Sequence, residues 1–255
     1  MDEIFWTHQS DFPEGFLGTP NFSPTHLTWL SVSIAIIILT ALLLKKASHP
    51  VRQGVQRVLI IIAAVLEISR WIWAAIIRHY TVVDMLPFHL CSLSIWMEIA
   101  AVFSGKQLLK DFGYCLCMPG ALAALLTPDW YAYPFISFQY LHSVTVHSLL
   151  FLIPLIWVVS DGFRPNFKNL PKCFGILMLF AVPVFGLNFL LGSNYLFLRE
   201  APKDTPLELF ENLCGNPGYL VPLFLLIIVV WILLYLPWAV SDLLRSRKAK
   251  KEQEA

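Results

Sequence analysis

The chain has 255 residues, of which 57% are hydrophobic and 14% are charged, whereas soluble proteins average about 45–50% and about 25%. A mean hydropathy of +0.66 indicates that lipid is the solvent for much of the chain. The net charge of +1 gives no basic field for nucleic acid, and the five cysteines form no C-x-x-C pair, which excludes a disulfide framework and a cysteine zinc site.

Seven apolar stretches approach the length of about 20 residues that a membrane-spanning helix needs. They cover residues 27–44, 56–78, 86–103, 108–126, 137–159, 172–195 and 219–240. We therefore predict an all-α bundle of seven transmembrane helices over residues 27–240, preceded by an extracytoplasmic segment, 1–26, and followed by a basic tail, 241–255. Gly113, Pro119 and Gly120 interrupt the fourth stretch, and we expect it to be kinked.

The distribution of basic residues predicts the orientation of the bundle. Fourteen lysines and arginines lie in alternate loops and in the tail, whereas three lie on the other side. Cytoplasmic loops carry such an excess, so the N-terminus is predicted outside and the C-terminus in the cytoplasm. Residues 1–26 contain no lysine or arginine and no apolar run, which is not the pattern of a cleavable signal. We expect a multi-pass protein of the cell membrane whose tail contacts anionic lipid.

Glu67 and Arg70 stand in the middle of the second apolar stretch. A charge at the centre of a spanning helix costs roughly 2.5–3.5 kcal/mol, so such residues usually face a bundle interior. Being three residues apart, the two share a face and can pair. The pair either only neutralises itself and fixes the helix, or it lets Arg70 bind an anionic group such as a phosphate, with Glu67 positioning it.

The third stretch carries several polar side chains. His89 is expected one turn inside the helix, near the outer surface, and Ser92 shares its face. Cys91 lies about 200° further round the helix, which disfavours a Cys–His dyad. Glu98 lies near the inner end, where we expect its carboxylate to extend to the lipid headgroups or to pair two helices.

His142 and His147 belong to the fifth stretch, and Asn188 to the sixth. The two histidines are about 140° apart around a helix, so they do not form an i,i+4 metal pair, and we expect one of them, His142, to face the interior. Asn188 is more typical of a helix-pairing amide than of a ligand contact.

The direction of each helix places Glu67, Arg70, His89 and His142 at similar depth. These four residues are therefore predicted to line one pocket in the outer half of the membrane. The predicted catalytic residues are His89 and His142, and the predicted substrate-binding residues are Arg70, Glu67, Ser92 and Asn188. Neither a metal nor a cofactor is expected, because no motif for one is present.

Four motifs, "DMLPFHLCSLSIW", "GALAALLTPDW", "FQYLHSVTVHSLLFLIPL" and "GSNYLFLREAP", resemble those of the YwaF-like (TP0381-type) bacterial integral membrane proteins, over residues 55–240. These proteins are more distantly similar to animal transmembrane protein 164, an acyltransferase that moves a polyunsaturated acyl chain onto ether lysophospholipids. The proposed nucleophile of that relative is the cysteine of an N-P-C-H-L motif. The corresponding stretch here is L-P-F-H-L, so His89 matches the histidine and Phe88 replaces the cysteine, while His142 matches a histidine of the fifth span.

The resemblance implies a lipid-active enzyme, either an acyltransferase or an acyl hydrolase. His89 would be the general base, His142 would assist it and Arg70 would hold a headgroup phosphate. The nucleophile would be a lysolipid hydroxyl, a water molecule or Cys91. Two alternatives remain open: a transporter or binding protein for a small anionic or amphipathic solute, and a non-enzymatic assembly protein. Membrane lipids are the expected partners in every case, and nucleic acid is not.

Overall fold

The structure is a computed structural model that describes residues 2–253. The regular secondary structure of these residues is helical, and no β-strand occurs among them. Within this range, six helices are long and apolar enough to cross a membrane. They are α2 (Pro24–Lys45), α3 (His49–Ile76), the continuous run of α5 (Gln107–Phe112), η2 (Gly113–Cys117) and α6 (Met118–Leu126), then α7 (Phe138–Val159), α8 (Leu170–Leu191) and α10 (Leu220–Gln253).

The remaining apolar helix, α4 (Leu90–Ser104), is shorter than predicted, with 15 residues. The chain between Ile77 and His89 forms turns and irregular structure, and His89 has an extended backbone as the N-cap of α4. The reason is local: Pro87 has no N–H to donate and disfavours a helical conformation in the residue before it. The expectation that His89 lies one turn inside a helix was therefore wrong, and the third expected span, residues 86–103, is a short helix.

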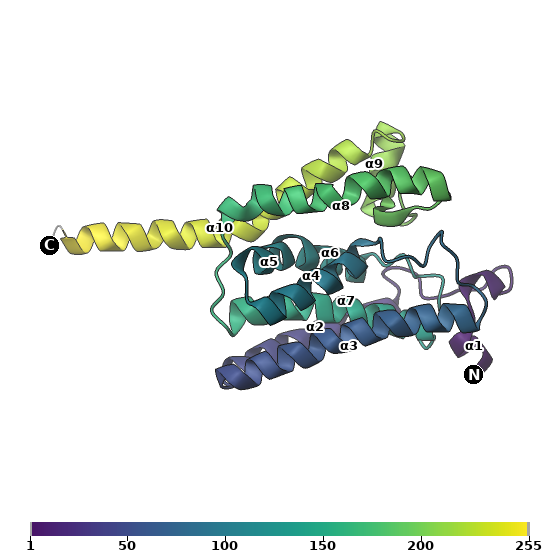
Figure 1. Cartoon of the computed structure of the whole chain (residues 1–255), viewed down its shortest axis with the longest axis horizontal. Coiled ribbons are helices and arrows are strands. Elements are labelled where there is room, and N and C mark those ends of the chain that lie inside the picture. Colours follow the sequence, from purple (N-terminus) through teal and green to yellow (C-terminus); the bar gives the residue numbers. More distant parts are fainter. Residues whose placement is uncertain (1, 254–255) are drawn as a thin grey trace.

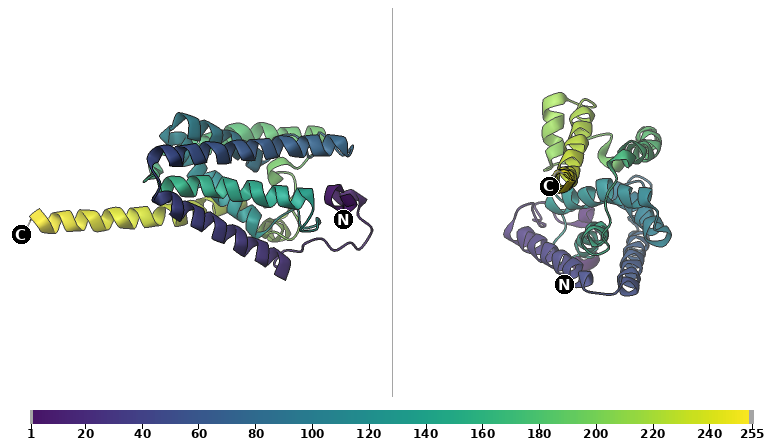
Figure 2. Two further views of the ribbon diagram at one scale, coloured as in Figure 1. Left: turned by 90° about the horizontal axis from the view of Figure 1, so that it is seen from below. Right: turned by 90° about the vertical axis from the view of Figure 1, so that its left-hand side faces the viewer.

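Helix α7 is the centre of the bundle. Seen along the bundle in the right-hand view of Figure 2, α2 and α3 flank it on two sides, and the layer of α4, α5 and α6 covers a third. Most of its side chains are buried, including the fully buried Tyr140, Ile153 and Trp157, whereas Thr145 is exposed. Because helices meet α7 on three sides, polar residues on more than one of its faces are internal.

Helices α8 and α10 form a further layer on the other side of α4, α5 and α6 (Figure 1). Three hydrogen bonds attach α10 to η2: Trp231 Nε1 donates to the Cys115 carbonyl at 2.9 Å, the Tyr114 hydroxyl to the Leu234 carbonyl at 2.8 Å, and Trp238 Nε1 to the Tyr114 hydroxyl at 3.0 Å. Beyond this attachment, α10 projects from the bundle as a single helix towards the C-terminus.

The predicted irregularity of the fourth stretch is present as the π-helical turn η2. Gly113 begins this turn against α7, and a Cβ atom at this position would lie 2.7 Å from the Trp157 ring. Glycine therefore permits the close approach of α7, and the widened turn is of a kind often found at functional sites.

We call the end of the bundle that carries residues 2–23 and loops 77–89, 127–137 and 192–219 the N-face, and the opposite end the C-face. On the N-face, α1 (Asp2–Trp6) and η1 (Gln9–Asp11) pack on the ends of α3 and α7, where Trp73 Nε1 donates to the Trp6 carbonyl at 3.0 Å. The N-face also carries η4 (Tyr195–Phe197) and α9 (Pro206–Cys214). On the C-face, η3 (Phe167–Asn169) is held by the fully buried Asp111, which accepts from the Asn169 amide at 2.6 Å.

Candidate functional site

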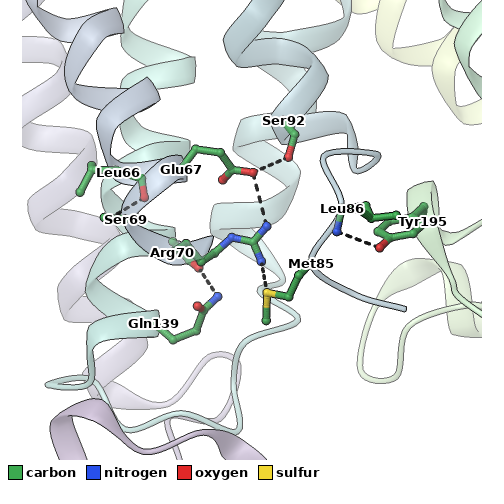
Figure 3. A network of polar contacts seen from close by, with 10 residues as sticks. Leu66, Glu67, Ser69, Arg70, Met85, Leu86, Ser92, Gln139 and Tyr195 are labelled. Carbon is green, nitrogen blue, oxygen red and sulfur yellow. Dashed lines mark hydrogen bonds and ion pairs between the residues drawn. The ribbon is translucent and has the colours of Figure 1, made fainter. Parts of the chain in front are cut away.

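The centre of the candidate site is the ion pair between Glu67 and Arg70 on α3. Arg70 Nη2 lies 3.4 Å from Glu67 Oε1, and the two side chains are 11% and 5% exposed. Ser92, on the first turns of α4, donates its hydroxyl to the same Glu67 oxygen at 2.7 Å (Figure 3). The structure thus confirms that the two charged residues pair, and it adds Ser92 to them.

The second terminal nitrogen of the Arg70 guanidinium has a different partner. Its Nη1 donates to the Met85 sulfur at 3.4 Å, and Met85 comes from the irregular segment before α4 (Figure 3). A thioether is a weak hydrogen-bond acceptor, whereas the guanidinium fork suits carboxylates and phosphates. One half of the fork therefore pairs with Glu67, and the other faces a group that an anionic oxygen can displace.

His142, on α7, is buried beside this pair. The charges of both Arg70 and Glu67 act on it, and its ring lies 5.9 Å from that of Phe138. Neither ring nitrogen has a hydrogen-bond partner among the described residues, although the backbone of Leu66 lies close. Buried polar atoms are rarely left unpaired, so the free nitrogens of His142 are a feature that a packing role does not explain.

His147 also faces the interior, contrary to the expectation that only one of the two histidines does. Its Nδ1 lies 2.7 Å from the Ser143 carbonyl, a contact that fixes Nδ1 as the protonated nitrogen and leaves Nε2 as an acceptor. The ring stacks on Trp130 at 4.9 Å, and the charges of Asp129, Glu67 and Arg70 act on it. The central position of α7 makes both histidines internal.

His89 lies at the start of α4. Its ring is 5.0 Å from that of Tyr195 and 5.7 Å from that of Phe197, both in η4. The charges of Arg70 and Glu67 act on His89 as well. The charges of the pair thus act on both His89 and His142, and the single pocket predicted for the four residues stays a prediction.

Asn188 makes its hydrogen bonds in the turn after α8. Its side-chain oxygen accepts from the Ser193 hydroxyl at 2.9 Å and the Tyr195 amide at 2.8 Å, and its nitrogen donates to the Tyr195 carbonyl at 2.9 Å. These bonds hold the turn after α8, whose Tyr195 hydroxyl accepts from the Leu86 amide and donates to the Val82 carbonyl. Asn188 thus supports the segment that leads to His89.

Glu98 is not located where its sequence position suggested. Its side chain is fully buried, and neither carboxylate oxygen has a hydrogen-bond partner among the described residues. The expected reach to the headgroups was wrong, because α4 packs against α3, α5, η2 and α7 and buries Glu98. Glu98 is a further buried acid, and unlike Glu67 it has no paired cation among the described residues.

Cys91 was predicted only as an alternative nucleophile, and Asp129 was not among the predicted site residues. Cys91 is half-buried, and the charges of Glu67, Arg70 and Asp129 act on it. Asp129, in the loop between α6 and α7, is exposed, yet its charge reaches Cys91 and His147. The only signal for Asp129 in the sequence is an acid within the aromatic stretch "TPDWYAY".

The model of the TMEM164 family matches residues 21–235. The chain belongs to the TMEM164 family. The matched range includes α2 to α8 and most of the apolar part of α10, and it therefore contains every residue of the candidate site. No match was found among curated proteins or among solved structures. The protein is thus a helical membrane protein of this family.

Proposed function

We propose that the protein is a membrane-embedded enzyme that transfers or hydrolyses an acyl chain of a phospholipid. The observation that carries the proposal is His142, which is buried beside the Glu67–Arg70 pair and has a ring nitrogen without a hydrogen-bond partner among the described residues. An imidazole with a free nitrogen next to an oriented ion pair is suited to general base catalysis. The resemblance to the YwaF-like proteins and to an acyltransferase, together with membership of the TMEM164 family, supports the same reaction class.

In this mechanism Arg70 binds the headgroup phosphate, which takes the place of the Met85 sulfur at Nη1. A histidine, His142 or His89, removes the proton from the hydroxyl of a lysolipid or from water, and the oxygen attacks the acyl carbonyl. The bond between the carbonyl carbon and its ester oxygen then breaks, and the histidine returns the proton to the departing oxygen. Cys91 is an alternative nucleophile, since it is accessible and lies near the pair.

The test is a reconstituted assay with a diacyl phospholipid and a lysophospholipid of different headgroup. We expect His142→Gln and His89→Gln each to reduce acyl exchange, by about 100-fold or more for the true general base, since such catalysis contributes roughly 10²–10⁴-fold. His49→Gln is the matched control, because His49 is exposed at the C-face start of α3. Activity in neither the transfer nor the hydrolysis assay, with correctly folded protein, would contradict the proposal.

A proton-coupled transporter of an anionic solute is the second candidate, and Glu98 favours it. An intramembrane carboxyl with no partner is typical of proton relays. The discriminating measurement is solute uptake into proteoliposomes: uptake that requires a pH gradient and is abolished by Glu98→Gln, without any change in acyl species, supports transport over catalysis.

A further inference from the structure

The short helix α9 carries its leucines on the outside and its acids on the inside. Leu209 and Leu213 are 57% and 74% exposed. They are four residues apart and therefore lie one above the other on the same face of the helix. Pro206, also exposed, continues this face towards the start of α9.

The carboxylates of α9 fold back onto the protein. Glu208 Oε2 accepts from the Asp204 amide at 2.7 Å, and Glu211 Oε2 accepts from the Ala201 amide at 3.0 Å. Both glutamates are half-buried. A helix on the surface of a water-soluble domain shows the reverse arrangement, with charges outside and apolar residues inside. The exposed face of α9 is therefore built for an apolar neighbour.

The position of α9 identifies that neighbour. In Figure 1 and in the right-hand view of Figure 2, α9 lies across the direction of the spanning helices, at the N-face and beside the start of α10. The first turns of α10 expose Val221 (64%) and Leu225 (56%), and α10 is one of the membrane-spanning helices. The leucines of α9 thus continue the apolar surface that α10 presents to lipid.

The loop around α9 is well fixed to the bundle. The Asn216 amide nitrogen donates to the Arg199 carbonyl at 2.6 Å, and the Tyr219 hydroxyl to the Phe197 carbonyl at 2.6 Å. Phe197 also contacts the ring of His89, so the segment after α9 is connected through Tyr219 and Phe197 to the candidate site. The hydrogen bonds of Glu211 and Asn216 thus set the orientation of α9 before any lipid binds.

We propose that α9 is an interfacial helix that lies in the membrane leaflet at the N-face, with Leu209 and Leu213 inserted between phospholipid acyl chains. Such helices enter the boundary of headgroups and acyl chains by about 5–10 Å. The ligand is the lipid leaflet itself, and the inference holds whether or not the protein is an enzyme.

The test is site-directed spin labelling of the full chain in vesicles of phosphatidylcholine and phosphatidylglycerol. The background replaces Cys91 and Cys214, the two cysteines that are not buried, by serine. Single cysteines then replace Leu209, Leu213 or Asn212, an exposed residue at the edge of the same helix. Val229→Cys on the lipid-exposed side of α10 is the reference for hydrocarbon. Collisions with oxygen, which concentrates in hydrocarbon, are compared with collisions with a water-soluble nickel chelate.

We expect labels at Leu209 and Leu213 to collide more with oxygen than with the chelate, as at Val229, and the label at Asn212 to show a lower ratio. Equal access of the chelate to Leu209, Leu213 and Asn212 would overturn the proposal, because α9 would then lie in water. Labels that neither reagent reaches, with dipolar broadening between chains, would overturn it in favour of a second copy. Labels that neither reagent reaches without broadening would also overturn it, because protein would then cover α9.

Discussion

Removing the charge of Glu67 while keeping its shape should destabilise the protein strongly. In Glu67→Gln, the side-chain oxygen still accepts from the Ser92 hydroxyl, 2.7 Å away in the native protein. Arg70 keeps its charge, and its side chain is 11% exposed. The substitution therefore isolates one quantity, the free energy of leaving a buried guanidinium without its carboxylate.

Breaking a buried ion pair from one side costs about 3–5 kcal/mol, whereas replacing both partners by neutral residues is often close to neutral. For a chain of 150–250 residues, each kcal/mol lowers the melting temperature by about 2–4 °C. Glu67→Gln should therefore lower it by about 6–20 °C. The double variant Glu67→Gln with Arg70→Met should recover most of that loss, because no unpaired charge remains.

Thermal unfolding in detergent micelles, followed by the fluorescence of the nine tryptophans, measures the effect. Asp242→Asn is the control, since it breaks the Arg164–Asp242 pair at the C-face, whose side chains are 37% and 63% exposed. Exposed pairs contribute about 0–1 kcal/mol, so this variant should melt close to the wild type. If Glu67→Gln melts as high as Asp242→Asn, or if the double variant is no more stable than Glu67→Gln, then Arg70 does not depend on Glu67 and the reasoning about the site is refuted.

Three further outcomes are expected. Burial and the neighbouring charge of His79 lower the pKa of His8 below its ordinary value of about 6.5, so the stabilisation from neutral His8 is complete above that pH and is lost as the pH falls below it. The protection factors of amide exchange in residues 2–23, which are corrected for the slower intrinsic exchange at low pH, should therefore fall more between pH 7.5 and 5.5 (about 1 unit either side of that value) in the wild type than in His8→Gln. This difference separates His8 from the Asp11–His79 pair, and an equal fall in both proteins would exclude the effect. Tyr195→Phe leaves the Leu86 amide without its acceptor and should cost about 1–3 kcal/mol of unfolding free energy, whereas unchanged stability would show that this bond is not needed. Asp111→Ala removes the buried acceptor of the C-face and should cost a similar amount in the same melting assay, unless the loop after α7 has another attachment.

The apolar helices and the Glu67–Arg70 pair could be predicted from the sequence, because both depend on properties of a single helix. Hydropathy over about 20 residues indicates whether a helix lies in lipid, and a spacing of three residues indicates that two side chains share a face of the helix. The depth argument that grouped His89 and His142 with the pair also needed only helix direction and rise per residue.

The remaining features depend on which helices are neighbours, which periodicity does not reveal. Glu98 near a helix end suggested access to headgroups, but its surroundings are set by α3, η2 and α7. The same holds for His147, which is internal because α7 is central. Helix α9 did carry a local signal that we did not use: Pro206 at its first turn, Gly215 just after its end and two leucines four residues apart.

The central position of α7 has a consequence for assembly. During synthesis, α2 to α6 enter the membrane before α7 exists, so the interior surfaces that later enclose α7 first meet lipid or one another. Arg70 must pass that interval without His142 or the loops of the N-face, and Glu67, one turn away on its own helix, is already available to neutralise it. An ion pair formed within one helix can thus neutralise a buried charge before the finished bundle encloses it.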